Sequence, residues 1–199
     1  MPSFEDICRS LFCSAEAGKR LLIGGLLSFV PVLNLFAFGY LYRFADQFRQ
    51  TGKLELPEWN DWGVLFAQGL YFFVIALLYF WVPVLIGWLL ALILFQLSLG
   101  FLGIVALLPV SVAVVLGVAL MTSALFEFQL GAYWKNLLNW KRIVRRVVSL
   151  WPALVLPIVL FSGVIFLGMS LFGFAFFVGF LILIVYTTSV FAQSEIENS

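Results

Sequence analysis

Residues 62–126 read WGVLFAQGLYFFVIALLYFWVPVLIGWLLALILFQLSLGFLGIVALLPVSVAVVLGVALMTSALF and contain no Asp, Glu, Lys or Arg. A helix needs about 20 apolar residues to cross the hydrocarbon core of a bilayer, so this stretch is long enough for two spans joined by a turn. Residues 21–42 and 147–194 also lack charged side chains. The pattern predicts an integral membrane protein built from helices.

The composition of the whole chain leads to the same class. Of its 199 residues, 64% are hydrophobic and 11% are charged, and the mean hydropathy is +1.12. Soluble domains carry about 25% charged and about 45–50% apolar residues. A globule of this size cannot hide so much apolar surface from water, so we expect an all-α membrane helical bundle with about four full spans.

We expect one membrane domain that covers residues 1–199. Pro31 interrupts the first apolar stretch, and a proline inside a helix removes a hydrogen bond and bends the helix. That stretch is therefore either a fifth span or a re-entrant hairpin. The expected elements are an interfacial amphipathic helix at 3–18, the kinked or re-entrant segment at 21–42, spans at 64–92 and 100–126, a basic amphipathic helix at 131–148, and spans at 150–168 and 171–191.

A weak internal repeat bears on the side of the N-terminus. A single crossing at 21–42, with an outside N-terminus, would agree with the repeat, whereas Lys19 and Arg20 favour an inside N-terminus and a re-entrant hairpin. We give the charges more weight, because Gly and Pro are common in this chain and the repeat is loose. In it, Gly25, Pro31 and Gly39 recur with the same spacing as Gly103, Pro109 and Gly117, and Trp62 recurs as Trp140.

A group of cations predicts the topology. Cytoplasmic loops of membrane proteins carry an excess of Lys and Arg, and each cation near an anionic lipid surface can add about 1 kcal/mol of binding. We therefore expect residues 131–148 to bind anionic lipid on the cytoplasmic side of the cell inner membrane. Pairs of spans then place 43–61 and the C-terminus of this multi-pass protein on the same side. The expected lipid-binding residues are Lys135, Lys141, Arg142, Arg145 and Arg146.

The residue types argue against catalysis. The chain has no histidine, and its two cysteines, Cys8 and Cys13, form no CxxC pair. Histidine-based acid–base or nucleophilic chemistry is thereby excluded, and a zinc site would need unusual ligands. We expect no enzyme activity, no cofactor, no metal and no nucleic-acid partner.

The sequence ELPEWNDWG, residues 55–63, combines Glu55, Glu58 and Asp61 with two tryptophans. Pro57 suits the first turn of a helix, acids favour a helix N-terminus, and tryptophan belongs at headgroup depth. We interpret the motif as the cap and anchor of the following span. A ligand or ion site made by the three acids and a catalytic carboxylate pair are the alternatives. The expected interface anchors are Trp59, Trp62, Trp134, Trp140 and Trp151.

Glu127 is the acid that lies close to a long apolar run. Ionisable residues inside a membrane are candidates for function, so Glu127 is a candidate intramembrane polar site on a permeation path. It lies near the cytoplasmic end of its expected span, within reach of Lys135 or the arginines. We therefore favour an ion pair.

The stretch LLIGGLLSFVPVLNLFAFGYLYRF, residues 21–44, followed by LELPEWNDWGVLFAQGL, residues 54–70, closely resembles a family of prokaryotic membrane proteins, domain-of-unknown-function family 4013. A second similar region runs from FEFQLGAYWKNLLNWKRIVRRVVSLWP, which begins at residue 126, into the two closing spans. The resemblance implies a bacterial or archaeal origin and a polytopic membrane location, but no activity, substrate or catalytic residue. The shared landmarks are Gly24-Gly25, Pro31, Asn34, Gly39-Tyr40, Leu56-Pro57, Asp61-Trp62-Gly63, Phe66 and Gly69.

Three classes of function compete. We favour a non-enzymatic membrane subunit or scaffold that packs with partner proteins or with itself and lies on anionic lipid through its amphipathic helices. The alternative is a small-solute or ion transporter or channel built on the weak parallel repeat. A lipid-active enzyme comes last. The expected partners are the bilayer, anionic lipids, and a membrane protein or a second copy of the chain.

Overall fold

The computed structural model describes residues 15–98, 101, 103–131, 134–168 and 171–197. In these ranges every regular element is a helix, which confirms the all-α class. Three helices are long and apolar enough to cross a membrane, Trp62–Leu97, Gly103–Gly131 and Gly173–Ser194, and a fourth span results if Trp140–Ser149 and Trp151–Ile165 are counted together. The helix expected at 3–18 lies outside the described residues up to residue 14, as do Cys8 and Cys13.

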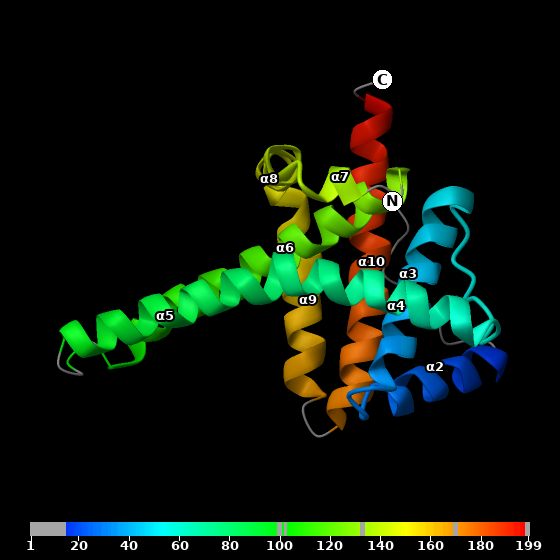
Figure 1. Cartoon of the computed structure of the whole chain (residues 1–199), viewed down its shortest axis with the longest axis horizontal. Coiled ribbons are helices and arrows are strands. Elements are labelled where there is room, and N and C mark those ends of the chain that lie inside the picture. Colours follow the sequence, from blue (N-terminus) through cyan, green and yellow to red (C-terminus); the bar gives the residue numbers. More distant parts are fainter. Residues whose placement is uncertain (1–14, 99–100, 102, 132–133, 169–170, 198–199) are drawn as a thin grey trace. The chain divides into compact units, whose positions relative to one another are not determined.

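The chain divides into two compact units, unit 1 with Met1–Phe73 and Leu150–Ser199, and unit 2 with Val74–Ser149. Unit 1 is built around α10, which packs against α2, α3 and α9 (Figure 1). Of the apolar stretch in α10, 72% is buried, and aromatic side chains fill its surroundings. The helices are α2 (Ala15–Leu27), α3 (Asn34–Thr51), α4 (Trp62–Ala76), α9 (Trp151–Leu167) and α10 (Phe172–Glu197), and the buried aromatic residues include Tyr40, Phe44, Phe177 and Phe191.

The apolar segment at 21–42 is divided between two helices. Residues 28–33 form turns between α2 and α3, and Pro31, which has no N–H to donate, lies among them. The Asn34 N–H then donates to Val30 O at 2.7 Å. The structure thus breaks the segment at the proline.

The crossing of α3 and α4 brings two backbones into contact. A Cβ atom added to Gly39 would lie 1.8 Å from Leu65 O, and one added to Gly69 would lie 1.9 Å from Leu35 O. Phe38 and Phe72 stack beside the crossing with ring centroids 5.0 Å apart. Small residues permit such close approach between membrane helices, which explains why both glycines are landmarks.

Residues 52–61 form a loop without helix between α3 and α4. Gly52 ends α3 in the left-handed conformation, φ 67°, and its N–H donates to Phe48 O. Asp61 also has a positive φ, 52°, and its carbonyl accepts from the Val64 N–H at 2.8 Å. The expectation that Pro57 lies in the first turn of the span is wrong, because α4 begins at Trp62.

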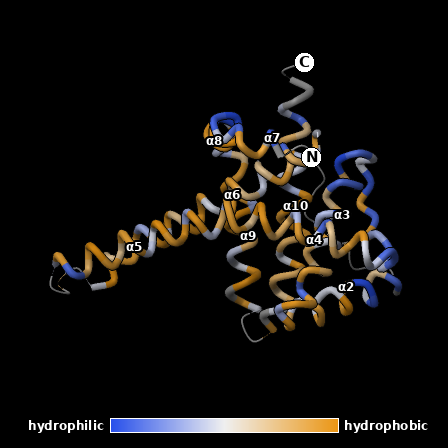
Figure 2. Tube along the Cα trace, viewed as in Figure 1, coloured by the Kyte–Doolittle hydropathy of each residue, from blue (hydrophilic) through white to orange (hydrophobic). Residues whose placement is uncertain are grey.

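In unit 2, two apolar helices pack side by side and two short helices follow. Gly87 of α5 packs against α6, where an added Cβ would lie 2.6 Å from Ala113 Cβ. In the span Trp62–Leu97 only 11% of the apolar stretch is buried, and Figure 2 shows that the residues of α5 and α6 are mostly hydrophobic. The elements are the π-helix η1 (Leu77–Trp81), α5 (Val82–Leu97), the 3₁₀-helix η2 (Gly103–Leu107), α6 (Leu108–Gly131), α7 (Trp134–Leu137) and α8 (Trp140–Ser149).

The basic segment expected as one helix at 131–148 is two helices. A break at Leu138 and Asn139 separates α7 from α8. The Asn139 carbonyl accepts from the N–H groups of Arg142, at 3.0 Å, and Ile143, at 3.3 Å. Asparagine is a favoured residue immediately before a helix, and α8 begins directly after Asn139.

Candidate functional site

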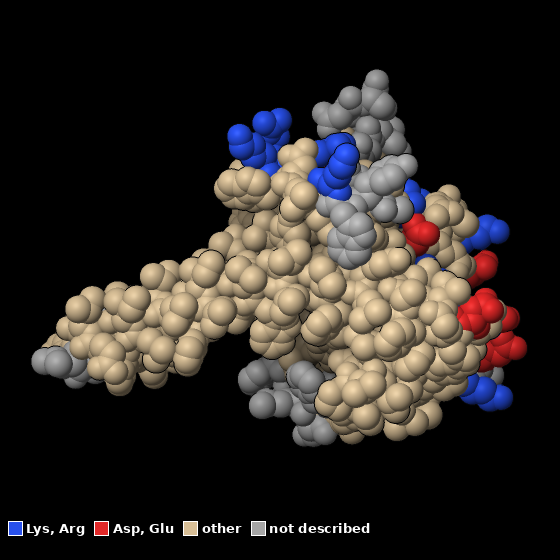
Figure 3. Space-filling view, in the orientation of Figure 1, with Lys and Arg blue, Asp and Glu red and all other residues tan. Residues whose placement is uncertain are grey.

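α8 has a buried face and an exposed face that differ in character. Lys and Arg atoms gather over this helix in Figure 3. The exposed face mixes cations with apolar side chains, whereas the buried face contains one cation between two aliphatic residues. The buried residues are Ile143, Arg146 and Val147, and the exposed residues are Trp140, Lys141, Arg142, Arg145, Val148 and Ser149.

The buried cation of α8 pairs with Glu127 of α6. Glu127 Oε1 lies 2.8 Å from Arg146 Nη2 and 3.1 Å from Arg142 Nε. The side chains of Glu127 and Arg146 are 2% and 8% exposed, whereas Arg142 is 55% exposed. The Arg146 guanidinium also lies over the Phe126 ring, 5.0 Å from its centroid. These contacts confirm the ion pair expected for Glu127, with two arginines as its partners.

The cluster of Glu127, Arg142 and Arg146 holds α8 against α6. A buried carboxylate is costly unless it is paired and hydrogen-bonded, so Glu127 constrains the position of both arginines. Ser123 of α6 adds a hydrogen bond from its Oγ to Ile143 O at 3.3 Å. In the same unit the Tyr79 hydroxyl donates to Leu137 O and holds α7.

The cluster divides the five cations predicted to bind lipid. Arg146 is directed into the protein, and Arg142 pairs with Glu127 while remaining half-exposed. Lys135, Lys141 and Arg145 are exposed. The structure therefore brings two of the five cations together with Glu127 and leaves three on the surface.

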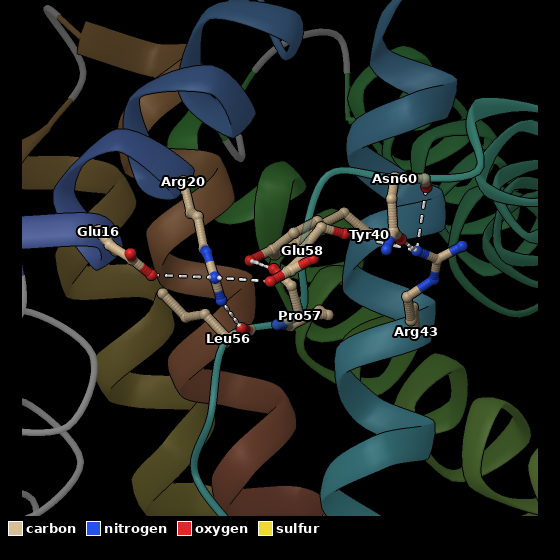
Figure 4. Close-up of polar contacts among 8 residues, drawn as sticks. All are labelled: Glu16, Arg20, Tyr40, Arg43, Leu56, Pro57, Glu58 and Asn60. Carbon is tan, nitrogen blue, oxygen red and sulfur yellow. Dashed lines mark hydrogen bonds and ion pairs between the residues drawn. The ribbon is translucent and has the colours of Figure 1, made fainter.

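A second group of polar contacts holds the loop at residues 52–61 in unit 1 (Figure 4). Side chains of α2 and α3 donate to the carbonyl groups of the loop, and one loop side chain donates back to α2. The loop therefore has a defined backbone although it contains no helix. The bonds are Arg20 Nη1 to Leu56 O, Tyr40 Oη to Pro57 O at 2.8 Å, Arg43 Nη1 to Asn60 O at 3.1 Å and to Asn60 Oδ1 at 2.6 Å, and Trp59 Nε1 to Arg20 O at 3.0 Å.

The tryptophans predicted as interface anchors occupy different environments. Trp59 is half-buried and stacks on Tyr40, with ring centroids 4.2 Å apart, so it packs inside unit 1. Trp62 and Trp140 are exposed, as an anchor at headgroup depth requires. Trp151 is half-buried, and the side chain of Trp134 lies outside the described part of the chain.

The sequence did not predict that two arginines, Arg20 and Arg43, would contact the loop. Arg20 lies 3.3 Å from Glu16 and 3.7 Å from Glu58, and Arg43 holds Asn60. Nothing in the spacing joins these arginines to the loop. The sequence did give a signal for Tyr40 and Pro57, because both are among the residues that the chain shares with the family. In the structure the Tyr40 hydroxyl donates a hydrogen bond to Pro57 O.

The arrangement offers electrostatic binding. No group of three or more His, Cys, Asp or Glu side chains within the described ranges could hold a metal ion. The exposed cations of α8 can meet anions, and the charged side chains around the loop can meet polar ligands of either sign.

A comparison with protein families finds a match over most of the chain. The family described as "Protein of unknown function (DUF4013)" matches residues 23–173, a range that includes the α3–α4 crossing, the loop, and the Glu127 cluster. No curated protein and no solved structure matches the chain.

Proposed function

The chain belongs to the DUF4013 family, and from the exposed face of α8 we propose that it is a non-enzymatic membrane subunit or scaffold that lies on anionic lipid. The observation that carries this proposal is the mixture of cations and large apolar groups on one exposed surface. Exposed Trp140 and Val148 flank the cations Lys141 and Arg145. An interfacial helix combines these two kinds of side chain, because the apolar groups enter the lipid while the cations meet phosphate.

The ion pairs of α8 support a specific choice of lipid-binding residues. Arg146 is compensated by Glu127, so its charge serves the fold. Lys141 and Arg145 make no ion pair with any described residue and remain available to lipid. At about 1 kcal/mol for each cation, the two together favour anionic over neutral lipid by roughly thirtyfold.

The proposal includes a topology in the cell inner membrane. The proposed spans are Trp62–Leu97, Gly103–Gly131 and α10, with α9 as the fourth span and α8 on the membrane surface before it, and with α2 and α3 as a re-entrant segment. Residues 43–61, residues 131–148 and the C-terminus then share the cytoplasmic side, as the distribution of Lys and Arg favours. The exposed apolar side chains of α5 face lipid, a membrane-protein partner or a second copy.

Native mass spectrometry of the full-length protein in mild detergent tests the lipid part. We expect wild-type protein to retain phosphatidylglycerol in preference to phosphatidylcholine, and Lys141→Gln with Arg145→Gln to reduce that preference by roughly thirtyfold. Lys53→Gln, which removes an exposed cation from the loop of unit 1, is the matched control. An equal loss in the control would contradict the proposal.

The same spectra test the scaffold part. A mass that corresponds to a second copy or to a co-purifying membrane protein supports a packing role. A bare monomer under conditions that preserve bound lipid would contradict that role while leaving the lipid result intact.

A second candidate, transport of a small solute, is favoured by the π-helix η1. Leu77–Trp81 interrupts the span Trp62–Leu97 and is followed by Pro83, and π-helical turns are frequent at functional sites. Proteoliposomes that pass ions or small neutral solutes faster than empty vesicles would support transport. Equal rates in both preparations would contradict it.

A further inference from the structure

A cavity lies where the loop at residues 52–61 meets α2 and α3, within unit 1. Its volume is about 690 Å³, which falls in the usual range of about 300–1,000 Å³ for small-molecule sites. Acidic atoms gather on the surface over this region in Figure 3. The charged and amide side chains of its lining include Glu16, Arg20, Arg43, Gln47, Glu55 and Glu58.

The cavity is held open by the loop contacts. Carbonyl groups of Leu56, Pro57 and Asn60 already accept hydrogen bonds from α2 and α3. The backbone of the loop is therefore ordered before any ligand arrives, so ligand binding carries no entropic cost of ordering the loop. What the loop presents to a ligand is its side chains, above all Glu55 and Glu58.

The lining of the cavity contains positive and negative side chains that can still bind a ligand. Arg20 lies between Glu16, at 3.3 Å, and Glu58, at 3.7 Å, so one guanidinium serves two carboxylates. Glu55 is exposed and pairs with no cation in the described part of the chain. Arg43 uses Nε and Nη1 for Gln68 and Asn60, and its Nη2 donates to no described acceptor. A ligand that matches this set carries an ammonium group and an oxyanion.

The nature of the two ligand groups follows from the side chains. A guanidinium edge suits the oxygens of a phosphate. Carboxylates accept N–H hydrogen bonds from a primary ammonium, whereas a quaternary ammonium is held by aromatic rings. None of the described side chains that line the cavity is aromatic. The exposed Trp62 at the end of the loop is a residue type that belongs at headgroup depth.

From these observations we infer that the cavity binds phosphoethanolamine, with its ammonium at Glu55 and its phosphate at Arg43. The group can be presented by a phospholipid headgroup or by the free compound. Phosphocholine, which has the same phosphate and no ammonium N–H, is the natural negative ligand. The site is independent of α8 and of the anionic lipid proposed to bind there.

The test titrates the detergent-purified full chain with short-chain phosphatidylethanolamine and with the phosphatidylcholine of the same acyl length, followed by native mass spectrometry. We expect the ethanolamine lipid to bind at least about tenfold more tightly, since hydrogen bonds to a charged group are the strong ones. Glu55→Gln should remove that preference. Asp61→Asn, a change of an exposed carboxylate that is in the same loop but does not line the cavity, should retain it.

A second arm distinguishes the source of the ligand. Free phosphoethanolamine and free phosphocholine are added at millimolar concentration to the same samples. Binding of the lipid but not of the free compound identifies a lipid site, and binding of the free compound alone identifies a soluble ligand of the same chemistry. Equal binding of the ethanolamine and choline forms, or an unchanged preference in Glu55→Gln, would overturn the inference.

Discussion

Alanine in place of Gly39 puts a methyl group into the crossing of α3 and α4. The added carbon would lie 1.8 Å from Leu65 O and 2.7 Å from Leu65 C. Both atoms belong to the backbone of α4, so no side-chain rotation can relieve the contact. The helices have to separate by more than about 1 Å to restore an ordinary contact distance.

The cost of that separation can be estimated from the neighbouring contacts. A radial gap of 0.5–1 Å forfeits about a quarter to a half of the dispersion energy between facing atoms, and the Phe38–Phe72 stack lies at the crossing. Overpacking of this kind costs about 1–3 kcal/mol. For a chain of this length we expect a fall in the thermal midpoint of about 2–4 °C for each kcal/mol.

Gly69→Ala gives the same clash from the other helix, at 1.9 Å from Leu35 O. Once the helices have separated for one methyl group, the second methyl costs less. The double variant should therefore lose less stability than the two single variants added together. This pattern distinguishes a shared contact from two unrelated effects.

Gly63→Ala is the matched control, because Gly63 also lies in α4 but an added Cβ meets nothing within 4 Å. Alanine favours a helix over glycine by up to about 1 kcal/mol, so the control should be neutral or stabilising. The measurement is the thermal midpoint of detergent-solubilised protein. Equal midpoints for Gly39→Ala and Gly63→Ala would refute the close crossing.

Three further predictions concern the polar contacts and the topology. Arg146→Gln should lower the free energy of unfolding by about 3–5 kcal/mol, because the buried Glu127 loses its closest partner. Arg142→Gln, which changes a half-exposed side chain, should cost about 1 kcal/mol or less. Similar losses in the two variants would contradict this ranking. Tyr40→Phe removes the donor to Pro57 O and should speed tryptic cleavage at the exposed Lys53, with an unchanged rate showing that the hydroxyl does not hold the loop. Single cysteines at Thr51 and Ser149, in a chain without Cys8 and Cys13, should both react with a reagent added from the cytoplasmic side, and reaction from opposite sides would exclude the proposed topology.

Composition and charge-free stretches were sufficient to predict the helical class, because lipid leaves few alternatives for an apolar chain. The proline at position 31 also marked the break between α2 and α3. These features are local, since they depend on the residues of one segment alone. They could therefore be predicted from the sequence without knowledge of any neighbour.

The start of α4 could not be predicted from local residues. Pro57 and the acids around it resemble the beginning of a helix, but Arg20, Tyr40 and Arg43 draw the carbonyl groups of the loop into hydrogen bonds with α2 and α3. In a helix those carbonyl groups would instead accept hydrogen bonds from the N–H groups four residues later. The decisive partners lie far away in the sequence, so the motif alone predicts the wrong boundary.

The prediction for the basic helix was wrong for a different reason. The sequence predicts one basic amphipathic helix at 131–148 with all five cations available to lipid, whereas a break at Leu138 and Asn139 separates α7 from α8. Arg146, expected beside the other cations, then turns inward to Glu127. The arginines were among the expected partners of Glu127, but nothing in the sequence indicated which arginine would be buried.

The polar side chains of the described residues support the proposal that the protein acts at the membrane surface. Residues 62–126 carry no charge, and two buried hydroxyls, those of Thr122 and Thr187, donate to carbonyl groups one turn earlier in their own helices, Val118 O at 3.1 Å and Leu183 O at 2.8 Å. Hydroxyls used in this way offer little to a passing solute. Charged side chains that form no ion pair with a described residue include Lys141 and Arg145 on α8 and Lys53 and Glu55 in the loop of unit 1. Substitution of surface charges such as Lys141, Arg145 and Glu55 should therefore change ligand binding more than substitution of Thr122 or Thr187.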